Sequence, residues 1–201
     1  MKKRIVRMCA MVAIVSPILG LLTGVASGAE AAAKDKPVAV ELGGGFIISP
    51  GYGSLLKDAY PHASSPGIGG WLNLQGGIRF RLSDQFSITP TLGVLLNYVI
   101  VSGGGQDENY LNSILVPSLS ARYSFSKAPS LYVGGEVNCN SPSSGSDRYD
   151  LKSDGIGFGG YVGYAFEGGM NMEVGYLDLP VKTRFSKENL GGVLLRAAFA
   201  F

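Results

Sequence analysis

Apolar and polar residues alternate along most of the chain beyond residue 37. In the segment 72–82, one set of alternate positions holds Leu, Leu, Gly, Ile, Phe and Leu, and the other holds Asn, Gln, Gly, Arg and Arg. A period of two places successive side chains on opposite faces of an extended chain. The segment is therefore predicted to be a strand with one apolar and one polar face.

The same alternation recurs in eight segments, which are separated by connections of two kinds. The segments are 38–48, 72–82, 86–100, 115–125, 131–140, 156–166, 170–176 and 191–201. The connections after Leu82, Phe125 and Phe166 are short and rich in turn-forming residues, whereas the other four are longer and more polar. Short turns at one end and long loops at the other are typical of transmembrane β-barrels. We predict an all-β protein, an eight-stranded antiparallel up-and-down transmembrane β-barrel.

Aromatic residues favour a membrane barrel over a soluble one. They occupy apolar positions in two groups, near the short turns and near the long loops. The first group is Phe80, Phe86, Tyr123, Phe125, Tyr164, Phe166, Phe199 and Phe201, and the second is Tyr98, Tyr110, Phe158 and Tyr176. Two aromatic girdles around an aliphatic band suit a lipid-facing exterior. The alternative, a soluble barrel, would expose the polar positions, which here carry few lysines.

The first 29 residues have the pattern of a cleaved secretory signal peptide. A basic start (residues 2–7) precedes an apolar stretch broken by Pro17, and Ser27 and Ala29 suit a cleavage site. The alternative, a membrane anchor, needs about 20 apolar residues without interruption. We therefore assign 1–29 to the signal, 30–36 to a short linker and 37–201 to the barrel.

The net charge of the chain changes once the signal is set aside. The whole chain has 17 basic and 15 acidic residues, and four of the basic ones precede residue 30, which leaves 13 against 15. A mature chain without basic excess argues against nucleic acid as a partner. Cys139 is the one cysteine beyond the signal, so no internal disulfide is expected.

Several segments resemble a known family. The stretches "VPSLSARYSF", "LYVGGEVN" and "FGGYVGYAFEGGMNMEVGY", with the terminal strand that has Phe201 last, are similar to the small outer-membrane β-barrel superfamily of OmpX, OmpW, the opacity proteins and the OmpA transmembrane domain. The resemblance spans about residues 37–201. It implies the cell outer membrane as location, and membrane lipid and lipopolysaccharide as partners. It also implies that Phe201 is the signal that the barrel-assembly machinery reads. The sequence departs from the OmpA-like pattern in one respect, because no peptidoglycan-binding domain is expected after Phe201, and tethering to the cell wall is therefore not expected.

Catalytic and metal-binding patterns are weak. His62 is the single histidine, and it lies near Asp58, Ser64 and Ser65 in a long Gly/Pro-containing connection with no rigid element to hold a triad. The acidic residues of "SDRYDLKSDG", at 147, 150 and 154, lack the spacing of a calcium loop. We expect no enzyme activity, no cofactor and no metal site. Altered lipid A acylation on replacing His62 would contradict the first expectation.

Charged residues fall on the polar positions of the predicted strands. The set is Glu41, Arg79, Arg81, Arg122, Glu136, Glu173 and Arg196, and all are predicted to face the lumen near the short-turn end. An eight-stranded lumen is just wide enough for side chains to fill, and carboxylates and guanidinium groups can pair there. We expect this charge belt to plug the barrel, so that the protein acts as a structural or surface-interaction protein, its loops meeting any extracellular ligand. The alternatives are a narrow channel for small solutes, in which the charges are individually hydrated, and a lipid A-modifying enzyme.

Overall fold

A computed structural model of the chain describes residues 36–53, 55, 69–103, 106–143, 151–183 and 186–201. Within these residues the long strands are β1 (Val38–Ser49), β2 (Gly69–Arg81), β3 (Phe86–Gly103), β4 (Gln106–Phe125), β5 (Ala128–Cys139), β8 (Ile156–Ala165), β9 (Met170–Leu177) and β12 (Gly192–Ala200). The predicted signal peptide, most of the predicted linker and His62 lie outside the described residues. No helix in the described part of the chain is long and apolar enough to span a membrane.

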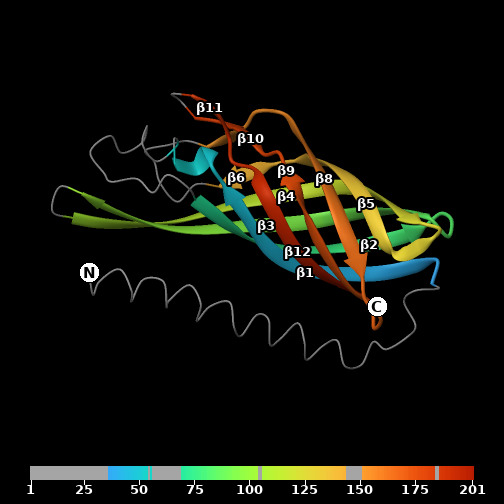
Figure 1. The fold of residues 1–201 in the computed structure, drawn as a ribbon. Coiled ribbons are helices and arrows are strands. Elements are labelled where there is room, and N and C mark those ends of the chain that lie inside the picture. The colour runs from blue at the N-terminus through green and yellow to red at the C-terminus, as the bar shows by residue number, and fades with distance from the viewer. Residues whose placement is uncertain (1–35, 54, 56–68, 104–105, 144–150, 184–185) are drawn as a thin grey trace.

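The long strands form a closed antiparallel barrel (Figure 1). Each strand pairs with the next one along the chain among the eight, and β12 returns to pair with β1. The closing pair is extended by Phe201, whose backbone N–H donates to the carbonyl of Val40 at 2.9 Å. The predicted fold class is therefore confirmed. We call the end with the turns 82–85, 126–127 and 166–169 the short-turn end, and the opposite end the long-loop end.

The short turns follow from local chemistry. Ser83 Oγ accepts the backbone N–H groups of Gln85 and Phe86, at 3.3 and 3.0 Å, which closes the turn between β2 and β3. Gly168 and Gly169, between β8 and β9, have φ of 85° and 82°, a left-handed conformation that is costly for residues with a Cβ.

The long-loop end contains more strand than the sequence predicts. β3 and β4 remain paired as far as Gly103 and Gln106, so the connection predicted between Ile100 and Tyr110 is shorter than expected. The strand β6 (Ser141–Ser143) pairs with β4, and β7 (Lys152–Ser153), β10 (Pro180–Lys182) and β11 (Lys187–Asn189) form a small separate sheet. Figure 1 shows β10 and β11 beyond the long-loop ends of β9 and β12. These strands are too short to show a readable period of two.

The barrel exterior is apolar. Leu92, Leu119 and Val174 are 51–54% exposed, and their neighbours along each strand face inward. Exposed aromatic rings lie near the short turns, where Tyr123 and Phe125 pack edge to face, as do Tyr164 and Phe166. Near the long-loop end Phe158 and Tyr176 are exposed. Phe199 differs from the predicted girdle because it is buried, with Leu42 and Met170 as its register partners, and the side chains of Tyr98 and Tyr110 lie outside the description.

Candidate functional site

The centre of the lumen is an ion-pair cluster around Glu173 of β9. Its Oε1 accepts from Arg122 Nη2 and from the Tyr132 hydroxyl, each at 2.9 Å, and its Oε2 accepts from Arg196 Nε at 2.5 Å. Arg196 lies directly opposite Glu173 on the neighbouring strand, whereas Arg122 comes from β4. Glu173 is buried, as are both arginines. One carboxylate therefore holds three donors from three different strands.

Two further carboxylates extend the cluster in opposite directions. Glu41 Oε1 lies 3.4 Å from Arg122 Nη1 and 3.0 Å from Arg79 Nη1. Glu136 Oε2 accepts from Arg196 Nη1 at 3.1 Å. The ion pairs thus form a chain of alternating sign, in the order Arg79, Glu41, Arg122, Glu173, Arg196, Glu136. Three guanidinium groups are balanced by three carboxylates, which is the arrangement that buried charges require.

The ion pairs described above do not include Arg81. Its Nη2 pairs with Asp84 Oδ1 at 3.2 Å in the turn after β2, and the Asp84 side chain is 99% exposed. The sequence predicts four arginines in the belt, and the ion pairs described above join three of them. Arg81 is the last residue of its strand, so it lies at the rim, where a turn residue is within reach.

Two tyrosines complete the cluster, although the sequence assigns them no role. The guanidinium carbon of Arg122 lies 4.3 Å from the ring centroid of Tyr132, and that of Arg196 lies 5.0 Å from the ring of Tyr161. A cation over an aromatic face is stabilised by the ring quadrupole. The signal available in the sequence is that both tyrosines occupy polar, inward positions.

Each tyrosine ring lies against a glycine of the neighbouring strand. Tyr132 is the register partner of Gly163, and Tyr161 is the partner of Gly134. A Cβ at Gly163 would meet the Tyr132 ring, and one at Gly134 would meet the Tyr161 ring. The absence of a side chain at these glycines leaves the space that the rings fill.

We therefore expect Gly163→Ala to destabilise the barrel by about 1–3 kcal/mol, the usual cost of overpacking. Urea unfolding of the refolded protein would measure it. The matched control is Gly160→Ala on the same strand, where the nearest atom to an added Cβ is 3.9 Å away. The cost should shrink when Tyr132 is also replaced by alanine. An equal cost in both backgrounds would contradict the packing explanation.

Above the charges, toward the long-loop end, the lumen is filled by apolar side chains. The cluster comprises Ile47, Tyr52, Leu55, Trp71, Leu95, Ile114, Val116, Leu151, Leu177, Leu179, Val181, Leu190 and Leu194. We call it the apolar layer. It combines inward positions of the long strands with residues of the connections, so the long loops fold into the mouth of the barrel. The alternation predicts mainly polar side chains at inward positions, and the strand residues that depart from it here include Ile47, Trp71, Leu95, Ile114, Val116 and Leu194.

Tyr52 and Trp71 anchor the apolar layer. Their rings pack edge to face with centroids 5.5 Å apart. The Tyr52 hydroxyl donates to Asn97 Oδ1 at 2.7 Å and accepts from Asn112 Nδ2 at 3.1 Å. The one polar group of this ring is therefore satisfied inside an apolar environment, as burial requires.

The remaining candidate residues do not form a site in the described structure. Asp154 pairs with Lys187 at 3.0 Å and Lys182 at 3.9 Å, while Asp147 and Asp150 lie outside the described residues. No group of three or more His, Cys, Asp or Glu side chains suited to a metal occurs among the residues described. Cys139 is a free, exposed thiol.

Comparisons with known proteins agree with the fold. The chain matches no protein-family model and no curated protein sequence. Its structure is similar to that of Neisserial surface protein A, with a TM-score of 0.50, 16% identity, and coverage of 82% of this chain and 96% of that one. Weaker matches are the outer membrane protein OprG from Pseudomonas aeruginosa (TM-score 0.48, 14% identity, 86% and 97% coverage) and the Yersinia pestis outer membrane protein Ail (0.46, 9%, 81% and 99%). The chain therefore has the eight-stranded barrel fold of the small outer-membrane β-barrel proteins.

Proposed function

We propose that the protein is an integral outer-membrane barrel with a closed lumen, which acts as a structural or surface-interaction protein through its long-loop end. The observation that carries this proposal is that two groups of buried side chains fill the same lumen, one beyond the other. The buried chain of ion pairs lies toward the short turns, and the apolar layer lies toward the long loops. Eight strands enclose a space that side chains can fill. A continuous water path through the lumen would therefore require both the ion-paired side chains and the apolar layer to move aside.

The location follows from the exterior. An apolar band with aromatic rings on both sides is stable where lipid replaces water, and closed barrels leave no unpaired strand edge in the bilayer. Barrels of this kind carry short turns on the periplasmic side and longer loops outside. We therefore place the long-loop end at the cell surface. On the same basis we propose the barrel-assembly machinery as a partner, because Phe201 extends the strand pair that closes the barrel.

A row of lysines supports an anionic partner at the long-loop end. Lys152, Lys182 and Lys187 are register partners across β7, β10 and β11. Val181, next to Lys182, is fully buried in the apolar layer, so the lysine row faces away from the barrel. Like charges opposite each other repel, and Asp154 pairs with Lys187 at 3.0 Å and with Lys182 at 3.9 Å. Lipopolysaccharide phosphates are the partner of matching charge at this surface.

We expect the variant Lys152→Gln/Lys182→Gln/Lys187→Gln to associate with lipopolysaccharide at least tenfold more weakly than the wild type at low salt, where exposed charges are least screened. Titration of purified lipopolysaccharide into the detergent-solubilised barrel would measure the affinity. Lys127→Gln, which removes a lysine from the short-turn end, is the control. Equal affinity of the triple variant and the wild type would remove lipopolysaccharide as a partner of this row.

Conductance tests the closed lumen directly. We expect the wild-type barrel to show no stable ion conductance in planar bilayers, because the chain of ion pairs and the apolar layer both block the lumen. Trp71→Ala combined with Arg122→Ala removes side-chain volume from both the apolar layer and the chain of ion pairs, and the double variant is expected to conduct ions measurably. Stable wild-type conductance that neither Arg122→Ala nor Glu136→Ala alters would show that the charges do not plug the lumen, and would favour the narrow channel.

A further inference from the structure

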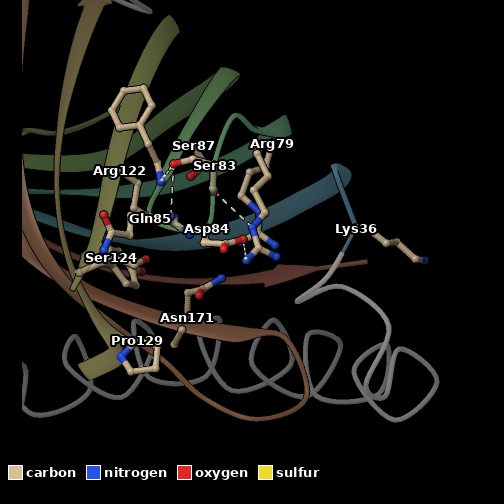
Figure 2. Close-up of a pocket in the computed structure, with 14 residues that line it drawn as sticks. Lys36, Arg79, Ser83, Asp84, Gln85, Ser87, Arg122, Ser124, Pro129 and Asn171 are labelled. Atoms are coloured by element: carbon tan, nitrogen blue, oxygen red, sulfur yellow. Dashed lines mark hydrogen bonds and ion pairs between the residues drawn. The ribbon is translucent and has the colours of Figure 1, made fainter. Parts of the chain in front are cut away.

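The short-turn end contains a pocket that the proposed function does not use. Its volume is about 130 Å³, and the described residues that line it include Lys36, Arg79, Arg81 and Arg122. Figure 2 shows Arg79 and Arg122 with Ser83 and Asp84 around the mouth of the barrel, and Lys36 at the edge with its side chain directed away from them. Three arginines therefore line one small pocket, with Lys36 at its edge. Asp84 is the one carboxylate among the described lining residues, and its exposure to water weakens its effect on the field.

The ion-pair chain of the lumen adds to the positive field of the pocket. The chain is neutral in total, but its cationic end, Arg79, lines the pocket. Its anionic end, Glu136, lies farther from the short turns, because Glu136 is the register partner of Ser120 while Arg122 is two residues nearer the turn. The chain is thus polarised with its positive end toward the pocket. A cleft lined by one sign of charge within a protein wall concentrates counter-ions.

Hydrogen-bond donors are also present. Ser83 Oγ accepts two backbone N–H groups, which leaves its own proton to donate. Ser87 and Ser124 add further hydroxyl groups to the lining. Guanidinium groups with neighbouring hydroxyls are the donors that proteins use for phosphate oxygens.

We propose that this pocket binds a phosphate group, either as inorganic phosphate or as the headgroup of a phospholipid in the adjoining leaflet. The volume is well below the about 300 Å³ at which pockets begin to enclose drug-sized organic ligands, so a small anionic group is the fitting occupant. The pocket faces the periplasm if the long loops face outside. Phosphate binding does not depend on whether the lumen conducts ions, so the two proposals fail separately.

The test is calorimetric titration of the refolded barrel in phosphate-free maltoside micelles at low salt. One arm uses inorganic phosphate, and the other uses a short-chain phosphatidylglycerol. We expect saturable binding in at least one arm, weakened at least tenfold by Lys36→Gln/Arg81→Gln, since neither residue belongs to the ion-pair chain of the lumen. Binding of the lipid alone would identify the headgroup as the ligand, and binding of both would identify an open phosphate site.

The matched control is Lys127→Gln, which removes a positive charge from the same end of the barrel but does not line the pocket. It is expected to bind with wild-type affinity. Circular dichroism of each variant verifies that the barrel is folded. The proposal is overturned if the wild type shows no saturable binding in either arm, or if Lys127→Gln loses as much affinity as the double variant.

Discussion

Alanine in place of Glu173 is expected to lower the free energy of unfolding by about 3–5 kcal/mol, the range observed when one partner of a buried ion pair is removed. Glu173 is the acceptor for Arg122, Arg196 and Tyr132. Without it, two buried guanidinium groups lose their shared counter-charge while Glu41 and Glu136 remain at the ends of the chain. Equilibrium urea unfolding of the barrel refolded into lipid or detergent would measure the change.

Two controls separate charge from shape in this experiment. Glu173→Gln keeps the size of the side chain but removes its charge, so we expect it to retain only part of the lost stability. Glu167→Ala removes an exposed carboxylate in the turn between β8 and β9 and should change the free energy of unfolding by less than about 0.5 kcal/mol. If Glu173→Ala is as stable as Glu167→Ala, the ion pairs of the lumen do not hold the barrel together.

The second large effect is expected in the apolar layer. Trp71 is fully buried, and its ring packs on Tyr52. Trp71→Ala removes this contact and leaves a cavity, and large-to-small changes of an aromatic core residue cost about 3–5 kcal/mol. Because Tyr52 belongs to the connection after β1, losing its partner should also loosen the closure of the long-loop end. Urea unfolding would show the loss of stability, and faster proteolysis near Tyr52 would show the loosening.

Two leucines of β3 provide the control for this cavity effect. Leu95 faces the lumen and is 1% exposed, whereas Leu92 faces outward and is 54% exposed. Both changes to alanine reduce the apolar area removed from water on folding, but lipid chains can fill the space at Leu92, so the cavity term applies to Leu95 alone. We expect Leu95→Ala to be the more destabilising change. Equal costs would mean that the lumen relaxes around cavities as freely as lipid does.

The alternation of the sequence was sufficient to predict the barrel wall. A period of two is a local property, because the pleat of each strand places successive side chains on opposite faces whichever strand lies beside it. The apolar exterior around Leu92 and Leu119 and the inward direction of Glu173 and Arg196 follow from it. Closure by the last strand was instead predicted from the even number of strands and the alternation of short turns and long loops. Short strands such as β10 and β11 could not be predicted, since three residues contain too little of the pattern.

Only the tertiary structure decided which inward side chains meet. Arg122 contacts Glu41 across 81 residues of sequence, and Arg196 contacts Gln75 across 121. Such contacts depend on the stagger of the strands once the sheet has closed, and that stagger is a property of the whole ring. The same closure brings the long connections over the mouth, which is why Trp71 and Leu95 face an apolar interior although they lie on the polar side of their strands. Periodicity therefore determined the face of each residue, and the closed barrel determined its neighbours.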